Sequence, residues 1–194
     1  ILSGQSQWMT AGSGILHQEM PRPADRMLGV QLWINLPRKD KMTEPKYFDI
    51  TGDMIGKMIM DNATVRVISG NYEGVTGVSP HHVQATFLDV ELNRGSSISL
   101  YTKPEDNTFI FLIEGDAIVH GEIIREKTAV LFGKGDRVAV SAPEGKKSHF
   151  LFLSAEPLNE PISWGGPIVM NTEEELRHAF EELRYGRFIK HAPV

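Results

Sequence analysis

The feature that most constrains the fold of this chain is a succession of short runs in which apolar and polar residues alternate. Each run ends at glycine, proline or a polar turn, and the 194 residues include 18 glycines and 11 prolines. Alternation with a period of two is typical of a strand that buries one face, and glycine and proline mark the turns between strands. The sequence therefore predicts a mostly β chain built from many short strands.

Seven segments carry this pattern. In residues 63–70, Val65 and Val67 are expected to point inward and Arg66 outward. The residues 114–116 and 133–136 have the composition of tight turns. So many short strands favour closure into a barrel or a sandwich. The other predicted strands and hairpin arms are residues 29–36, 83–92, 97–103, 109–124, 128–142 and 148–155.

The pattern changes only near the C-terminal end. Thr172 and Glu175 have the spacing of a capping box, and glycine at position 186 is suited to ending a helix. The sequence therefore predicts one helix over residues 173–185, with an apolar stripe that is buried as a core contact. The stripe recurs at helical spacing through Leu176, Ala179, Phe180 and Leu183.

Composition limits the classes of function. Hydrophobic residues make up 41% of the chain and charged residues 23%, which predicts a soluble globular protein with a real core. The net charge of -5 argues against binding nucleic acid through a broad basic surface. The sequence has no cysteine, and we find neither a signal peptide nor an apolar run long enough for a membrane span. These features predict a cytoplasmic protein, or a nuclear one in a eukaryote.

His17 and Glu19 are the strongest candidates for chemistry. They lie two residues apart, so on an extended strand both side chains would point to one face and project into the same cavity. An imidazole nitrogen and a carboxylate oxygen together suit a divalent transition metal ion. Two ligands hold such an ion poorly, and the chain contains no His-x-His motif. The alternative interpretation is a surface histidine beside an acid.

The remaining histidines are more simply explained by structure. His149 lies in an apolar segment and is expected to be packed or capped, whereas His178 is expected to face solvent from the predicted helix. His120 is also interpreted as structural.

Three longer segments carry a resemblance to a known family. They are WMTAGSGILHQEMP (8–21), GVQLWINLP (29–37) and EPLNEPISWGGPIVMNTEEEL (156–176), and with them the match covers the whole chain in order. In these segments the chain resembles the pirin family of bicupins. The resemblance implies two cupin β-barrels in tandem, the first incomplete in this chain, followed by one C-terminal helix. It implies residues 1–93 as the remainder of the N-terminal cupin, 94–160 as a metal-free C-terminal cupin, and 161–194 as a tail with the helix.

The resemblance also implies a metal site. Pirins hold one non-haem iron with three histidines and one glutamate, and the last two ligands match His17 and Glu19 here. The first two come from an upstream Pro-His-Pro-His-Arg-Gly segment, which the printed sequence does not contain. We therefore expect the sequence to start after the first half of the N-terminal barrel, with further residues upstream.

Two functions follow from the resemblance. The first is oxygenation of a flavonol, or a related chelating substrate, by a quercetin 2,3-dioxygenase-type reaction, with Glu19 also acting as base for the flavonol hydroxyl. Trp8, Met9 and Gln31 are candidates near the cavity, or core residues. The second is iron-dependent regulation, in which the surface of residues 21–27 binds a transcription factor or a metabolic enzyme. The acidic net charge favours a protein partner over direct contact with DNA.

Overall fold

The computed structural model describes residues 2–79 and 81–191, which form two compact units. The first unit contains residues up to 6 and residues 49–157, and the second contains residues 7–48 and the chain from 158 onward.

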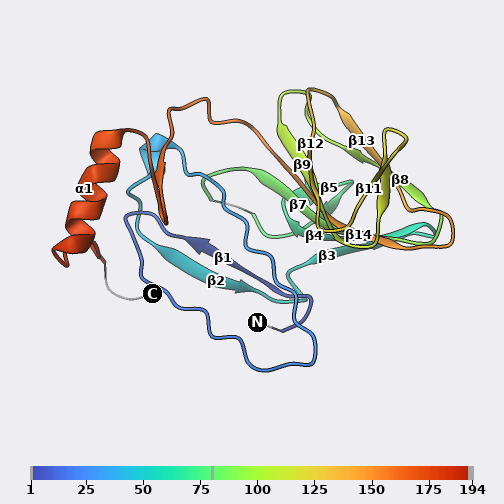
Figure 1. The fold of residues 1–194 in the computed structure, drawn as a ribbon, viewed down its shortest axis with the longest axis horizontal. Helices are drawn as coiled ribbons and strands as arrows, with labels where there is room; N and C mark the ends of the chain where they lie inside the picture. Colours follow the sequence, from blue (N-terminus) through green and yellow to red (C-terminus); the bar gives the residue numbers. More distant parts are fainter. Residues whose placement is uncertain (1, 80, 192–194) are drawn as a thin grey trace. The chain divides into compact units, whose positions relative to one another are not determined.

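A six-stranded antiparallel sheet dominates the first unit (Figure 1). Its strands in spatial order are β12 (Ala129–Leu131), β9 (Asn107–Glu114), β14 (Ser148–Ala155), β7 (Ala85–Leu92), β4 (Ala63–Ser69) and β3 (Gly56–Ile59). A four-stranded antiparallel sheet has the order β11 (Glu122–Ile124), β10 (Ala117–Val119), β13 (Arg137–Ser141) and β8 (Ser97–Tyr101). A small hairpin joins β5 (Asn71–Tyr72) to β6 (Val75–Thr76).

Both sheets contribute to one apolar core. On β7 and β13 the buried core residues alternate with less buried ones, and the central strand β14 is buried over most of its length. The two sheets enclose the core and keep open edges, as in a β-sandwich. Burial of these side chains is the main source of stability for such a fold. The core includes Val65, Val67, Leu88, Val90, Ile110, Leu112, Phe150 and Phe152 from the larger sheet and Leu100, Val119, Val138 and Val140 from the smaller one.

The strands of the first unit confirm the predictions made from alternation. Val65 and Val67 are fully buried in β4, while Arg66 points outward and pairs with Asp89 on β7. The predicted turn at 114–116 requires its glycine. Gly115 has a φ of +76°, and a Cβ there would lie 2.3 Å from the carbonyl oxygen of Lys147.

The prediction of a strand over residues 29–36 is wrong. The segment has the alternating pattern, yet it forms no strand, and its Val30 and Trp33 side chains are about half exposed. A strand forms only when a neighbouring strand supplies hydrogen-bond partners for its backbone. No strand of the described residues pairs with this segment, so the alternation is not realised as a sheet.

The second unit contains the remaining elements. β1 (Ser6–Thr10) and β2 (Lys46–Ile50), most of whose residues belong to this unit, form a two-stranded sheet. A single 3₁₀ turn, η1 (Arg38–Asp40), precedes β2. Near the C-terminal end, β15 (Ser163–Gly165) and β16 (Ile168–Met170) form a hairpin, and helix α1 (Glu173–Arg184) follows it.

Helix α1 confirms the predicted helix, including its start. The Oγ1 atom of Thr172 accepts a hydrogen bond from the backbone N–H of Glu175 at 3.2 Å. The Glu175 carboxylate in turn accepts from the backbone N–H groups of Thr172 at 2.9 Å and Asn171 at 3.0 Å. This reciprocal arrangement is a complete capping box, and it satisfies N–H groups that the first helical turn leaves without partners.

The predicted burial of the helix stripe is only partly correct. Ala179 is buried and Leu176 is partly buried, but Phe180 is 38% exposed and Leu183 is 37% exposed. The hairpin β15–β16 packs against the helix, with Gly165 beside Phe180 and Leu176. Three-residue strands extend only about 10 Å, whereas a helix of 12 residues extends about 18 Å. The hairpin is therefore too short to cover the whole stripe.

Removing the cap should destabilise this unit. Replacing Thr172 with alanine is expected to lower the free energy of unfolding by about 1 kcal/mol, because the N–H of Glu175 loses its acceptor. Urea unfolding followed by circular dichroism measures the change. Thr172→Ser keeps the hydroxyl and should retain most of the stability, so equal losses in both variants would contradict the cap.

The same cap makes the helix sensitive to acid. The pKa of Glu175 lies below its ordinary value of 4.5: desolvation raises it, but the N–H groups of Thr172 and Asn171 and the guanidinium of Arg38 lower it by more. A lowered folded-state pKa gives stability that is present above pH 4.5 and lost as the pH falls through the folded value. Glu175→Gln should therefore flatten the loss of stability between pH 5 and pH 3, measured by urea titrations. Exposed Glu174→Gln is the matched control and should leave the loss unchanged.

The fold class predicted from the sequence, mostly β with one C-terminal helix, agrees with the described residues. The predicted domain boundary at residues 93 and 94 falls between β7 and β8, and it stays a prediction. The strands on its two sides share the six-stranded sheet, in which β7 pairs with β14.

Candidate metal centre

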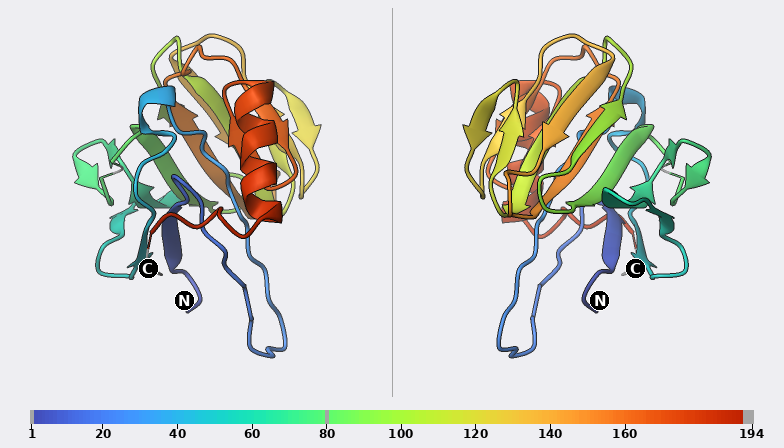
Figure 2. Two further views of the ribbon diagram at one scale, coloured as in Figure 1. Left: turned by 90° about the vertical axis from the view of Figure 1, so that its left-hand side faces the viewer. Right: turned by 90° about the vertical axis from the view of Figure 1, so that its right-hand side faces the viewer.

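His17 and Glu19 lie on a long loop of the second unit. The loop runs from the end of β1 at Thr10 to the start of β2 at Lys46, and η1 is its one regular element. Its outer part, drawn in blue, extends as two adjacent chain segments, the N-terminal and the C-terminal arm, which join at the far end (Figure 2). Both His17 and Glu19 are exposed there.

The spacing of His17 and Glu19 predicted that both side chains project from an extended strand into one cavity. The residues around them form no strand in the structure, so that part of the expectation is wrong. The reason is the one found for residues 29–36, because no described strand pairs with this segment. The role of His17 and Glu19 as metal ligands remains a prediction.

A side-chain hydrogen bond joins the two arms of the loop. The amide Nε2 of Gln31 donates a hydrogen bond to Oε1 of Glu19 at 3.2 Å, across twelve residues of sequence. The carboxylate is therefore held by a neutral donor from the opposite arm.

The N-terminal base of the loop is held by close backbone contacts. The N–H of Ser13 donates to the carbonyl oxygen of Thr43 at 2.8 Å. Gly12 has a φ of +50°, and a Cβ there would lie 2.1 Å from the same carbonyl oxygen, so glycine is required at this position. The small residues before His17 thus allow a close approach of two chain segments.

The C-terminal base is held by a buried lysine. Lys41 is only 7% exposed, and its Nζ donates to Oδ1 of Asn35 at 2.6 Å. Burial lowers the pKa of Lys41, and the nearby carboxylates of Glu160 and Glu175 partly oppose this shift. The sequence alone does not single out this lysine, because the four consecutive residues Arg38–Lys41 are all charged and no local pattern marks the buried one.

The same base is tied to the C-terminal segment of the unit. The backbone N–H of Arg38 donates to Glu160 at 2.7 Å, and the Arg38 guanidinium lies 3.5 Å from Glu175. The side chain of Asn171 is buried, with 3% of its surface exposed, and its Nδ2 donates to the carbonyl oxygen of Pro161 at 2.9 Å. The two segments that carry the family resemblance, 29–37 and 156–176, therefore both contribute residues to the polar contacts around Arg38 and Lys41.

His149 lies elsewhere, on the outer face of the six-stranded sheet. Its Nε2 is 2.5 Å from Oδ1 of Asp89, and Asp89 also accepts from Nε of Arg66 at 3.1 Å. The histidine is therefore capped by a carboxylate rather than packed in the core, the second of the two roles expected for it. His178 is exposed on α1, as predicted.

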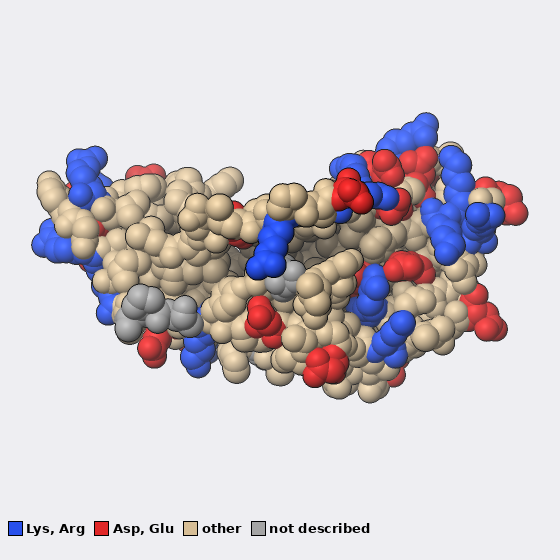
Figure 3. Space-filling model, turned by 90° about the horizontal axis from the view of Figure 1, so that it is seen from below, with Lys and Arg blue, Asp and Glu red and all other residues tan. Residues whose placement is uncertain are grey.

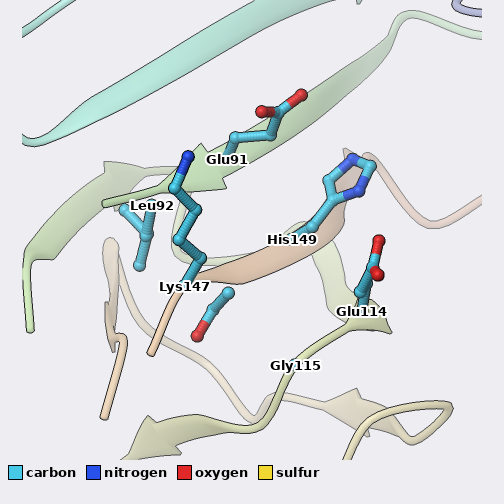
Figure 4. Close-up of a pocket in the computed structure, with 7 residues that line it drawn as sticks. Glu91, Leu92, Glu114, Gly115, Lys147 and His149 are labelled. Carbon is cyan, nitrogen blue, oxygen red and sulfur yellow. The ribbon is translucent and has the colours of Figure 1, made fainter. Parts of the chain in front are cut away.

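A pocket of about 380 Å³ opens beside His149 (Figure 4). His149 is directly opposite Glu91 on β7 and Glu114 on β9, so acidic side chains flank it on both neighbouring strands. The pocket contains groups of both charge signs, and its geometry does not bring together the ligands of a metal ion. It is lined by Glu91, Leu92, Glu114, Gly115, Lys147, Ser148 and His149.

The donor atoms of His17 and Glu19 suit iron chemically, since imidazole nitrogen and carboxylate oxygen both bind it. Their number does not suffice. Within residues 2–79 and 81–191, no three histidine, aspartate or glutamate side chains gather as a metal site. The described residues therefore supply two donors and do not by themselves fit a tightly held iron.

The 194-residue chain alone is accordingly expected to bind iron weakly, because water would have to fill most coordination positions. Metal analysis after dialysis, with the intact mass measured on the same sample, tests this expectation. About one tightly held iron per chain of 194 residues would contradict it.

Two further properties bear on partners. The described part of the chain contains no helix with the length and hydropathy of a membrane span. On the face shown in Figure 3, basic and acidic side chains are interspersed with large uncharged areas, so that face presents no broad basic surface.

Comparison with family models gives two matches. The model described as the Pirin C-terminal cupin domain matches residues 87–189, which is more than half of the chain. The model described as Pirin matches residues 1–34, which include His17, Glu19 and Gln31.

Comparison with individual proteins gives relatives of the same family. The chain is 40% identical to Pirin of Rattus norvegicus over 93% of its own length, and it spans 64% of that relative. It is 34% identical to a Thermoplasma acidophilum protein whose name assigns it provisionally to quercetin 2,3-dioxygenase, covering 98% of this chain and 80% of the relative. A crystal structure titled quercetin 2,3-dioxygenase from Acinetobacter baumannii superposes with a TM-score of 0.82 at 31% identity, over 97% of this chain and 68% of the other.

Proposed function

Because the chain belongs to the pirin family and has its cupin fold, we propose that it is part of a non-haem iron protein that oxygenates a flavonol as a quercetin 2,3-dioxygenase does. The observation that carries the proposal is the similarity to a solved structure named for that activity, over nearly the whole chain. The chain spans less than two thirds of the rat relative, so the activity is proposed for the protein that carries this chain.

In this proposal His17 and Glu19 are two of the metal ligands. Iron, when bound, would supply the site for dioxygen and for the adjacent hydroxyl and keto oxygens of the flavonol. Two more nitrogen donors are required, and the family resemblance assigns them to a Pro-His-Pro-His-Arg-Gly segment that the printed sequence lacks.

Glu19 has a second proposed role as a base. Its carboxylate would take the proton of the flavonol hydroxyl, since a carboxylate within hydrogen-bond distance of a substrate hydroxyl can accept its proton. The Gln31 amide donates to Oε1 of this carboxylate, and Oε2 is the atom proposed to receive the proton.

Oxygen uptake tests the proposal. The full-length protein is loaded with Fe²⁺ without air, and quercetin is added in air-saturated buffer. We expect oxygen consumption that follows the loss of the flavonol absorbance. A protein that holds iron but consumes no oxygen with quercetin would contradict the proposal.

A second function is favoured by the surface of the same loop. Large apolar side chains on the loop that carries the two proposed ligands are exposed, including Leu16 at 73%, Met20 at 76% and Met27 at 64%. Exposed apolar side chains that gather in a patch are typical of protein interaction sites. Under this alternative the protein is an iron-dependent regulator that binds a transcription factor or a metabolic enzyme, and the quercetin experiment gives no turnover.

A further inference from the structure

The C-terminal base of the long loop and the N-terminal end of helix α1 are held by the same side chains. The backbone N–H of Arg38 donates to Oε2 of Glu160 at 2.7 Å, and Nδ2 of Asn171 donates to the same oxygen at 3.4 Å. The backbone N–H of Asn171 donates to Oε2 of Glu175 at 3.0 Å, and Nη2 of Arg38 lies 3.5 Å from Oε1 of that carboxylate. These four contacts close a ring, the clasp, which consists of Arg38, Glu160, Asn171 and Glu175.

Lys41 balances the charge of the clasp. Its side chain is buried, and its Nζ donates to Asn35. Burial lowers the pKa of Lys41, and the charges of Glu160 and Glu175 partly oppose that shift, so the ammonium lies within electrostatic reach of both carboxylates. Two carboxylates therefore face two cations, the ammonium of Lys41 and the guanidinium of Arg38. Removal of the ammonium would leave one carboxylate without a compensating charge, which is costly where water is partly excluded.

The turn that carries Lys41 also holds the other end of the loop. The backbone N–H of Thr43 donates to the carbonyl oxygen of Asp40 at 3.0 Å, and the carbonyl oxygen of Thr43 accepts from the N–H of Ser13 at 2.8 Å. A displacement of this turn therefore affects both arms of the loop.

Glu175 belongs to the loop base and to the helix cap at once. Its Oε2 accepts from the backbone N–H of Thr172 in the capping box, while its Oε1 faces Arg38. We propose that the clasp couples the long loop to the cap of helix α1, so that the two loosen together. The order of the loop that carries His17 and Glu19 then depends on the helix cap, whatever those two residues bind.

Amide exchange followed by nuclear magnetic resonance on the full-length protein tests the coupling from the loop side. Local opening of a structure exposes its amides to exchange. The N–H of Glu175 reports on the cap, because it donates to Oγ1 of Thr172. Lys41→Met removes the ammonium and keeps a side chain of similar length. We expect it to speed the exchange of the Glu175 amide about fivefold or more, the lower end of typical coupling between sites.

The same coupling is tested from the helix side, because coupling between two sites is reciprocal. Thr172→Ala weakens the cap, and the N–H of Arg38 reports on the loop base through its bond to Glu160. We expect Thr172→Ala to speed the exchange of the Arg38 amide about fivefold or more as well.

The controls are matched in position and chemistry. Lys39→Met makes the same change at an exposed lysine of the same 3₁₀ turn, and Glu174→Gln alters an exposed residue in the first turn of the helix. Both should leave the two reporter amides unchanged. Exchange in strand β1, in the same unit, should be unaffected by any variant.

Three results would overturn the proposal. In the first, Lys41→Met speeds exchange at Arg38 and leaves the Glu175 amide unchanged. In the second, Thr172→Ala lowers the stability and leaves the Arg38 amide unchanged, a result that decides alone if Lys41→Met does not fold. In the third, the amides of β1 accelerate as much as the two reporters, which would mean that the whole unit loosens without a specific clasp.

Discussion

Replacing His17 with alanine in the full-length protein is expected to abolish flavonol oxygenation while the fold remains intact. Mutation of a hydrogen-bonding partner of a metal ligand typically lowers metal affinity or activity about 10–100-fold. Loss of a ligand itself should therefore lower the turnover of quercetin by more than about 100-fold. The imidazole is exposed on a loop without strands, so its removal leaves no cavity in the core. Oxygen uptake measures the activity, and thermal unfolding measures the stability.

The control for this prediction is His149→Ala. His149 pairs with Asp89 on the outer face of the six-stranded sheet, and its ring is partly exposed. Its removal should lower stability by about 1 kcal/mol, as for one hydrogen bond, and leave oxygenation unchanged. Full dioxygenase activity in His17→Ala would show that the iron lies elsewhere, and loss of activity in His149→Ala would implicate the pocket beside it.

Replacing Phe152 with alanine is expected to have the largest effect on stability. The side chain is fully buried on β14, in the centre of the six-stranded sheet, where it lies opposite Leu88 and Ile110. Truncation of such a side chain leaves a cavity and should cost about 3–5 kcal/mol. Urea unfolding of the two variants Phe152→Ala and Phe180→Ala measures the difference.

Phe180→Ala is the matched control, because the same ring is removed from a position that is 38% exposed. Its cost should be clearly smaller, about 1–2 kcal/mol, since only part of its surface leaves water on folding. Equal losses of unfolding free energy in the two variants would mean that Phe180 on the apolar stripe of helix α1 is buried in solution, as the sequence alone had predicted.

The apolar alternation and the capping box were sufficient to predict most of the regular structure. Val65 and Val67 face the core and Arg66 faces outward, because strand side chains alternate whatever the partner strand. Helix α1 begins at Glu173 for an equally local reason, since Thr172 and Glu175 bond to each other within one turn.

The candidate site was predicted only as a pair of residues. Their identity and spacing suited a metal, but the strand expected to carry them depended on backbone partners that sequence alternation cannot supply. Gln31 was a candidate without an assigned role, and its contact with Glu19 spans twelve residues. Lys41 was not identified at all, because its partner Asn35 and the nearby carboxylates of Glu160 and Glu175 are brought to it only by the tertiary structure.

The sequence by itself thus determined the elements whose causes are local: strand alternation, the turn at Gly115, the cap of α1 and the donor chemistry of His17 and Glu19. Only the tertiary structure decided which segments find partners. Residues 29–36 alternate as β4 does, yet β4 lies between β3 and β7, whereas no strand in the described part of the chain pairs with 29–36. The physical reason is that a strand's hydrogen bonds and buried face are completed by other segments, so the same pattern gives a sheet in one place and a loop in the other.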